Sequence, residues 1–220
     1  MNVPELKNRL ILIGGSHMFL IAKHLRDSVP QKSFPFNIYE ITKTGYTLAR
    51  LIKEKYLQIS DITSLTDKDV IIVHGFGNSL FPKKNVLVTK ERNQKIFHIT
   101  NPETKNVLPE IQLAKEFFRK TQAKVYFIDN WPRHLLCCPH HPWTKTIPDQ
   151  KKLNTQIHTL LGGEFLVLTH KQALRLNRAQ TRNFYLVAKK TRDRVHLTST
   201  GYRQFALFLL NQLSKSYAPH

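Results

Sequence analysis

The sequence predicts an α/β protein built on a three-layer, doubly wound and mainly parallel five-stranded sheet of the flavodoxin-like kind. Short apolar runs, typical of strands buried inside a parallel sheet, recur along the 220 residues. A helix-like segment lies between each run and the next. Crossovers between parallel strands are right-handed, so helices are expected on both faces of the sheet. The length allows one such domain with a sizeable core, spanning residues 1–220.

The expected strands are short and rich in apolar side chains, and they comprise residues 9–13, 36–41, 69–74, 124–129 and 164–168. The run 69–74 (DVIIVH) is of the type found in the middle of a sheet. Apolar spacing typical of helices occupies the intervening segments, at residues 18–25, 46–59, 108–121 and 151–161, with a last helix at 205–213. No internal repeat or linker divides the chain.

One segment, Asn85 to Pro102, is an addition to the strands and helices that a fold of this type requires. Two short β-like runs, 86–89 and 95–100, flank a polar turn within it. The pattern predicts an inserted antiparallel hairpin. Such a hairpin is either a solvated decoration or a lid or partner surface.

The chain is organised around its first apolar run, residues 9–13, and the turn that follows it. Gly14, Gly15, Ser16 and His17 come next, before an apolar stretch with helical spacing. Strand, glycine turn and helix together present a hydroxyl at the carboxyl edge of a parallel sheet, above a helix N-terminus that favours negative charge. Ser16 is therefore a candidate nucleophile; the alternative is a plain turn in which Ser16 caps the helix.

The sequence DRVHLTSTGY near the other end places Asp193 three residues before His196, in a segment that leads into the last helix. Asp193 could orient the imidazole of His196, which would then act as a base towards Ser16. The order Ser, Asp, His along the chain is also that of other hydrolases whose site lies at a sheet edge.

These two stretches resemble the SGNH (GDSL-like) hydrolases, whose first block is Gly-Asp-Ser and whose last is Asp-x-x-His. Gly45 in ITKTGYTLARLI resembles the second block, and Asn78 in DVIIVHGFGNSL resembles the third. The resemblance implies a catalytic triad of Ser16, Asp193 and His196. It also implies an oxyanion hole formed by Ser16, Gly45 and Asn78, an ester substrate and no cofactor.

Two positions depart from the family pattern. Gly15 replaces the acidic residue that usually precedes the serine, and Ser79 replaces the acidic residue that often follows the asparagine. Neither position belongs to the four catalytic positions of the family, so the apparatus is complete in sequence. The loops around it are expected to be set differently.

The charge is unusual, because 34 Lys and Arg against 15 Asp and Glu leave a net charge of +19. Such a surface attracts polyanions such as RNA or single-stranded DNA. Basic residues crowd the segment before His196, where Phe184 and Tyr185 could stack on bases. The candidate nucleic-acid-binding residues are Lys171, Arg175, Arg178, Arg182, Lys189, Lys190 and Arg192. The alternative is a solvated charged face.

A Cys- and His-rich loop also suggests a metal site, since thiolate and imidazole are ligands that zinc prefers. Its adjacent cysteines and adjacent histidines cannot readily all reach one ion, so loop packing is favoured over a metal. Trp131 and Trp143 from the same region could line a substrate pocket. The residues concerned are His134, Cys137, Cys138, His140 and His141.

Two functions of different class remain open. The first is a serine esterase of the SGNH type, similar to the esterase domains that some retrotransposons encode. The second is a basic RNA-binding module on the same fold, as in Oskar-like SGNH domains, which have lost the triad. No stretch is apolar enough to span a membrane, and the first residues lack the apolar region of a signal peptide. An intracellular location, cytoplasmic or nuclear, is therefore expected.

Overall fold

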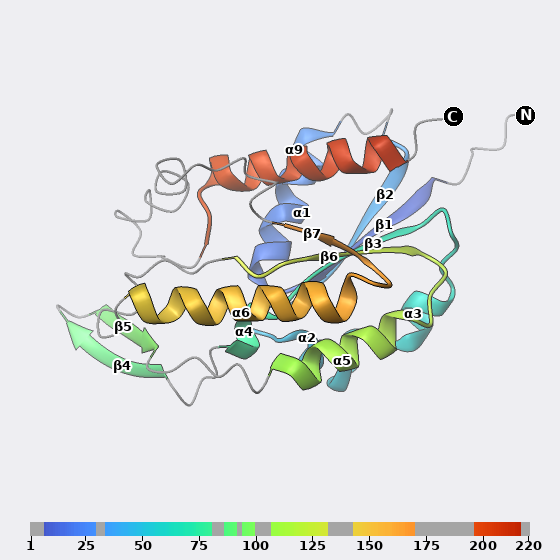
Figure 1. The fold of residues 1–220 in the computed structure, drawn as a ribbon. Coiled ribbons are helices and arrows are strands. Elements are labelled where there is room, and N and C mark those ends of the chain that lie inside the picture. The colour runs from blue at the N-terminus through green and yellow to red at the C-terminus, as the bar shows by residue number, and fades with distance from the viewer. Residues whose placement is uncertain are drawn as a thin grey trace, which may run out of the picture.

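Five parallel strands form the central sheet in the order β2-β1-β3-β6-β7 (Figure 1). The computed structural model describes residues 7–29, 34–80, 86–91, 94–99, 107–131, 143–169 and 196–216. The strands are β1 (Asn8–Gly14), β2 (Phe36–Thr42), β3 (Val70–His74), β6 (Lys124–Ile128) and β7 (Leu166–Leu168). Every pairing between neighbours is parallel, which confirms the predicted doubly wound sheet.

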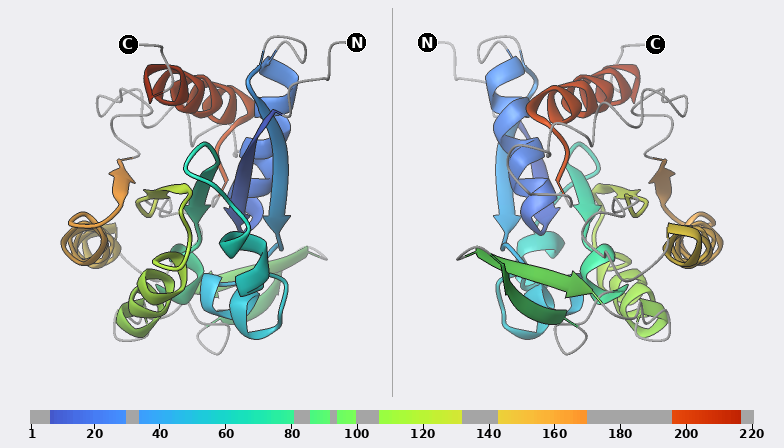
Figure 2. Two further views of the ribbon diagram at one scale, coloured as in Figure 1. Left: turned by 90° about the vertical axis from the view of Figure 1, so that its right-hand side faces the viewer. Right: turned by 90° about the vertical axis from the view of Figure 1, so that its left-hand side faces the viewer.

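Helices cover both faces of this sheet and make it the middle of three layers (Figure 2). One face carries α1 (Ser16–Ser28) and α9 (Ser199–Ser216). The other face carries α2 (Leu48–Lys53), α3 (Ile59–Thr63), α5 (Val107–Phe118) and α6 (Trp143–Leu161). The short α4 (Gly77–Leu80) follows β3. Among the described residues, no helix is both long and apolar enough to cross a membrane.

Alternation along β1 shows how the sequence fills both layers. Leu10 and Leu12 point to the face covered by α1 and α9, while Ile11 and Ile13 point to the face covered by α2 and α5. All four side chains are buried. A strand buried on both sides is apolar at every position, which is why this run is recognisable in the sequence.

Several helix boundaries differ from the prediction, and the last helix begins at Ser199 instead of residue 205. The helix expected over residues 46–59 is confined to α2, because Lys55 has a φ of 59°, in the left-handed region that ends a helix, and α3 begins only at Ile59. The backbone N–H of Leu57 then bonds the carbonyl oxygen of Leu51 at 3.1 Å, and Leu57 is buried. Later in the sequence, α6 begins at Trp143 rather than at Lys151.

The segment expected to form an insertion contains β4 (Val86–Glu91) and β5 (Gln94–Ile99). They pair antiparallel, from Val86 opposite Ile99 to Glu91 opposite Gln94, and make a two-stranded sheet of their own (Figure 2). Whether this sheet acts as a lid stays a prediction.

An ion pair ties β1 to the segment before β3 at the amino edge of the sheet. Arg9 donates to Asp69 through its backbone N–H at 2.7 Å and its Nη2 at 2.8 Å. The backbone N–H of Thr66 donates to the same carboxylate at 2.8 Å. Burial alone would raise the pKa of Asp69, but these hydrogen bonds outweigh it and hold that pKa at about 2.

Candidate active site

Ser16 and His196 meet at the carboxyl edge of the sheet. Ser16 is the first residue of α1, directly after the turn that ends β1, and His196 lies just before α9. The distance between Ser16 Oγ and His196 Nε2 is 2.6 Å, although 180 positions separate the two residues. Both side chains are half-buried. The geometry allows direct proton transfer between the hydroxyl and the imidazole.

The glycine turn before Ser16 leaves space for neighbouring loops. A Cβ atom on Gly14 would lie 2.0 Å from the carbonyl oxygen of His74, at the end of β3. A Cβ atom on Gly15 would lie 3.3 Å from Asn78 Nδ2. The asparagine amide therefore lies against the residue before Ser16, at the position where the family pattern has an acidic side chain.

Asn78 also holds the loop after β2. Its Nδ2 donates to the carbonyl oxygen of Tyr46 at 2.8 Å. The same loop is bonded to the glycine turn, because the backbone N–H of Lys43 donates to the carbonyl oxygen of Gly14 at 3.0 Å. Gly45 lies in this loop with a φ of +76°, a conformation that favours glycine. The loops that carry Gly45 and Asn78 thus both border the turn that carries Ser16.

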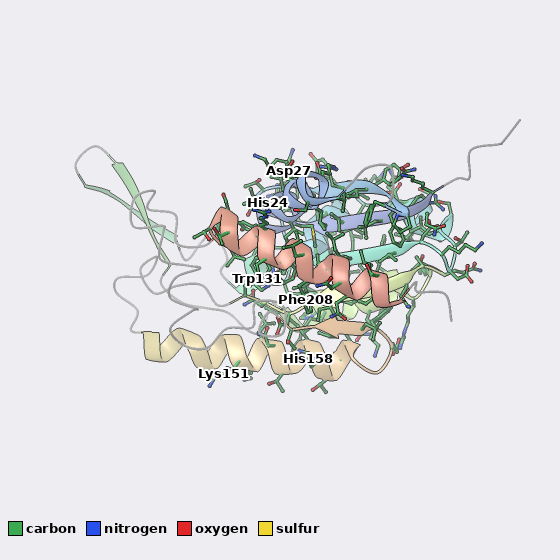
Figure 3. The ribbon with its side chains drawn as sticks, turned by 90° about the horizontal axis from the view of Figure 1, so that it is seen from above. His24, Asp27, Trp131, Lys151, His158 and Phe208 are labelled. Carbon is green, nitrogen blue, oxygen red and sulfur yellow. The ribbon has the colours of Figure 1, made fainter. Side chains whose placement is uncertain are left out.

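His17 packs inside a cluster of aromatic rings under the site. Its Nδ1 forms a 2.7 Å hydrogen bond with the Tyr202 hydroxyl, and its ring centroid is 4.9 Å from that of His196. Trp131 is equally close to His17 and only 2% exposed, so it is part of the packed interior; a role in a substrate pocket stays a prediction. Figure 3 shows Trp131 near α9, where its ring contacts Phe205.

Glu110 of α5 is a buried carboxylate beside the site, and no sequence motif marks it. It accepts a hydrogen bond from the backbone N–H of Ala49 at 2.8 Å, and another from the Ser79 hydroxyl. It is 4% exposed, and burial raises its pKa to about 7. The sequence does hold a signal, since Glu110 falls at helical spacing with the apolar residues Val107 and Ala114.

Several predicted site residues lie outside the part of the chain that the structure describes. Asp193 is one, so the third member of the predicted triad has no described position. The same holds for the candidate nucleic-acid contacts Lys171, Arg175, Arg178, Arg182, Lys189, Lys190 and Arg192, and for the loop with His134, Cys137, Cys138, His140 and His141.

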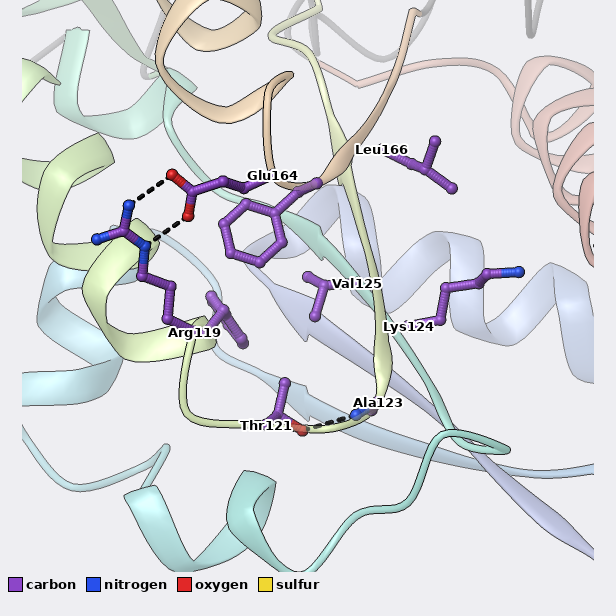
Figure 4. A pocket seen from close by; sticks show the side chains of 9 residues that line it. Arg119, Thr121, Ala123, Lys124, Val125, Glu164 and Leu166 are labelled. Carbon is purple, nitrogen blue, oxygen red and sulfur yellow. Dashed lines mark hydrogen bonds and ion pairs between the residues drawn. The ribbon is translucent and has the colours of Figure 1, made fainter.

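A cavity of about 330 Å³ lies at the amino end of β6, at the sheet edge opposite Ser16 (Figure 4). Apolar side chains such as Phe118, Val125 and Phe165 line it. At its rim, Arg119 holds both carboxylate oxygens of Glu164 at 2.5 Å. Hydrogen bonds from Arg119 lower the pKa of Glu164 to about 2. This cavity shares no residue with the Ser16 site.

Comparison by sequence finds no relative: no family model matches the chain, and no curated protein does. Comparison of structures does find similar proteins. A GDSL-like lipase from Bacteroides thetaiotaomicron has a TM-score of 0.62 at 13% identity, covering 95% of this chain and 89% of its own. The lipase/acylhydrolase from Enterococcus faecalis has a TM-score of 0.59 at 16% identity, covering 96% and 98%.

A protein from Bacillus subtilis is similar over only part of its length. Its TM-score is 0.61 at 13% identity, and the match covers 96% of this chain but 58% of the Bacillus protein. At such low identity, the three-dimensional likeness establishes the arrangement of the elements and not the chemistry. The chain has the fold of the GDSL-like, or SGNH, hydrolases.

Proposed function

We propose that this chain is a serine ester hydrolase of the SGNH type. The observation that carries the proposal is the 2.6 Å contact between Ser16 Oγ and His196 Nε2 at the N-terminus of α1. A nucleophile needs a partner that takes its proton, and this pair satisfies that need. Asp193, three residues before His196 in the sequence, is proposed to hold the imidazole in the required tautomer.

The reaction follows from the roles of these groups. The Ser16 hydroxyl gives its proton to Nε2 of His196 as Oγ attacks the ester carbonyl carbon. The imidazolium then protonates the departing alcohol, leaving an acyl-serine. A water molecule then attacks the acyl carbon, and His196 accepts the proton of the water. The resulting tetrahedral intermediate breaks down, His196 returns the proton to Ser16 Oγ, and the carboxylic acid is released. No step in this sequence requires a cofactor.

The negative oxygen that develops on the carbonyl needs hydrogen-bond donors. We assign this role to the backbone N–H of Ser16, the backbone N–H of Gly45 and the side-chain amide of Asn78. The N-terminus of α1 adds a favourable field. The loops of Gly45 and Asn78 border the Ser16 turn, which supports the assignment. The names of the Bacteroides and Enterococcus proteins, lipase and acylhydrolase, agree with an ester as the substrate.

The experiment that tests this function is labelling with a fluorophosphonate, together with hydrolysis of a short-chain aryl ester. We expect Ser16→Ala to abolish both. We expect His196→Ala to lower hydrolysis by a similar factor, at least about a thousandfold, because the two residues act as one unit. Ser28→Ala, at the other end of the same helix, is the matched control and should keep wild-type activity. Activity that survives Ser16→Ala would refute the assignment.

A second function, binding of RNA or single-stranded DNA, is supported by the net charge of +19. It is compatible with hydrolysis, as in an esterase that works close to nucleic acid. We infer it from charge, since the residues predicted to make the contacts lie outside the described part of the chain.

A further inference from the structure

Glu110 connects the two short helices, α2 and α4, that adjoin or contain the residues assigned to the oxyanion hole. One carboxylate oxygen accepts from the backbone N–H of Ala49, in the first turn of α2, which directly follows the loop of Gly45. The other oxygen accepts from the hydroxyl of Ser79, the residue after Asn78. A single buried side chain from α5 therefore contacts α2, which follows the Gly45 loop, and α4, which contains Asn78.

These contacts close a ring. The Asn78 amide donates to the carbonyl oxygen of Tyr46, and the chain runs from there into α2 and Ala49. Glu110 connects Ala49 to Ser79, and Ser79 is covalently joined to Asn78. Movement of either loop must break a hydrogen bond of this ring. The ring thus restricts where the Asn78 amide can lie.

Capping of α2 accounts for only some contacts of the carboxylate. Glu110 accepts hydrogen bonds from the backbone N–H groups of Leu48 and Ala49 and from the Thr47 side chain, but Ser79 lies outside α2. Thr47 is the N-cap of α2, and its side chain already accepts from the backbone N–H of Arg50 at 3.1 Å. A carboxyl group as buried as Glu110 is costly to ionise, which is reflected in its raised pKa. Retaining it at this position indicates a role beyond the helix end.

We propose that Glu110 is a positioning residue for the reaction inferred above, holding the Asn78 amide and the Gly45 loop where they stabilise the oxyanion. The proposal rests on the proposed function. It also accounts for the departure at Ser79, because the carboxylate that the family pattern has next to the asparagine is supplied here by α5, through the Ser79 hydroxyl.

Three variants test this role by steady-state hydrolysis of the aryl ester. Glu110→Leu removes every hydrogen bond of the carboxylate, including those to Ala49 and Ser79, and we expect kcat to fall about 30- to 100-fold with KM changed less than about twofold. Glu110→Gln keeps an oxygen for the N–H of Ala49 and can donate to Ser79, so kcat should stay within about threefold of wild type. Ser79→Ala removes one arm of the bridge and should lower kcat by about fivefold to tenfold, even if the leucine variant does not fold.

Asp69→Asn is the matched control. Asp69 is buried to the same degree and accepts several hydrogen bonds, but it lies at the opposite end of β3. We expect this variant to lose stability while kcat stays at the wild-type value. Unchanged kcat in folded Glu110→Leu and in Ser79→Ala would overturn the positioning role. An equal loss of kcat in Asp69→Asn would also overturn it, because the effect would then be one of stability.

A second measurement separates this proposal from the proposed function. Hydrogen exchange of the Asn78 side-chain amide, followed by NMR, needs no catalysis. We expect exchange at least about tenfold faster in Glu110→Leu or Ser79→Ala than in wild type, and unchanged in Glu110→Gln and Asp69→Asn. If wild type hydrolyses no ester, the proposed function fails by itself. Unchanged exchange in Ser79→Ala and Glu110→Leu would overturn the positioning of Asn78.

Discussion

At the scale of single residues, Gly14 and Gly45 differ in why they are glycines. A Cβ atom on Gly14 would lie 2.0 Å from a backbone carbonyl oxygen, which cannot rotate away. A Cβ atom on Gly45 would meet nothing within 4 Å, but the φ of +76° disfavours any other residue. At the first position a side chain is excluded by lack of space, and at the second it is disfavoured by the backbone conformation.

We therefore expect Gly14→Ala to lower the free energy of unfolding by about 3 kcal/mol or more, and Gly45→Ala by only about 1 kcal/mol. Urea denaturation followed by circular dichroism measures both values. Gly163→Ala, at an exposed position with nothing within 4 Å of its added Cβ, serves as the reference for a harmless substitution. Equal losses for Gly14→Ala and Gly45→Ala would contradict the distinction.

How far the sequence reveals the site also depends on the residue. Ser16 is recognisable because it follows a strand and a glycine turn and begins a helix. His196 is recognisable because Asp193 precedes it by three residues. Glu110 has no such motif, since its partners Ala49 and Ser79 are distant in sequence and come together only through packing of α5. Sequence motifs predict geometry among neighbouring residues, but the contacts of Glu110 join segments that are far apart in the sequence.

At the scale of elements, β3 has a buried carboxylate beyond each of its ends, and the two titrate in opposite directions. The pKa of Asp69 is lowered from 3.8 to about 2, so its contribution to stability is present above pH 4 and is lost as the pH falls towards 2. The pKa of Glu110 is raised from 4.5 to about 7, so its contribution is full below pH 4.5 and is lost as the pH rises through 7.

The free energy of unfolding, measured by urea denaturation from pH 2 to pH 8, should show both effects. The span attributable to Asp69 is roughly 2 kcal/mol, and that attributable to Glu110 is roughly 3 kcal/mol. In Asp69→Asn, the free energy of unfolding should depend less on pH than in wild type on the acid side. In Glu110→Gln, it should depend less on pH between pH 5 and pH 7. A profile for Glu110→Gln parallel to wild type over that range would show that Glu110 does not titrate there.

Strands were more predictable than helix ends for a physical reason. A strand inside a parallel sheet is buried on both sides, so β1 and β3 are apolar throughout and their limits match the prediction closely. The division between α2 and α3 depends on one left-handed residue, Lys55. Lysine has no preference for that conformation, so its sequence carries no signal of the break.

At the scale of the whole molecule, the net charge of +19 predicts binding to single-stranded nucleic acid with little sequence preference. Neutralised phosphates release condensed cations, so the affinity should fall steeply, at least about tenfold between 50 and 200 mM salt. Changing Arg175, Arg178 and Arg182 together to Glu should lower the affinity further and reduce the salt dependence. Fluorescence titration with an oligonucleotide at the two salt concentrations measures both.

The matched control places the same three charge reversals elsewhere, at Lys23, Lys53 and Lys152, which are exposed. Both triple variants have the same net charge, so a difference between them identifies a local surface. If the arginine variant binds as tightly as wild type, the segment 171–194 is a solvated surface. If it loses binding but keeps ester hydrolysis, the two functions use different sites.

The contact between Ser16 and His196 has a consequence for the order of events during synthesis. A ribosome releases β1 and α1 early, yet His196, the base proposed for Ser16, follows 180 residues later. The layer over α1 also stays open until Phe205 and Leu209 of α9 arrive, since both are buried in it. Domains generally fold as units during synthesis, so this one cannot complete its fold before α9 is made. For the hydrolase proposed above, Ser16 therefore has no base until α9 has been made and packed, and we expect ester hydrolysis to begin only then.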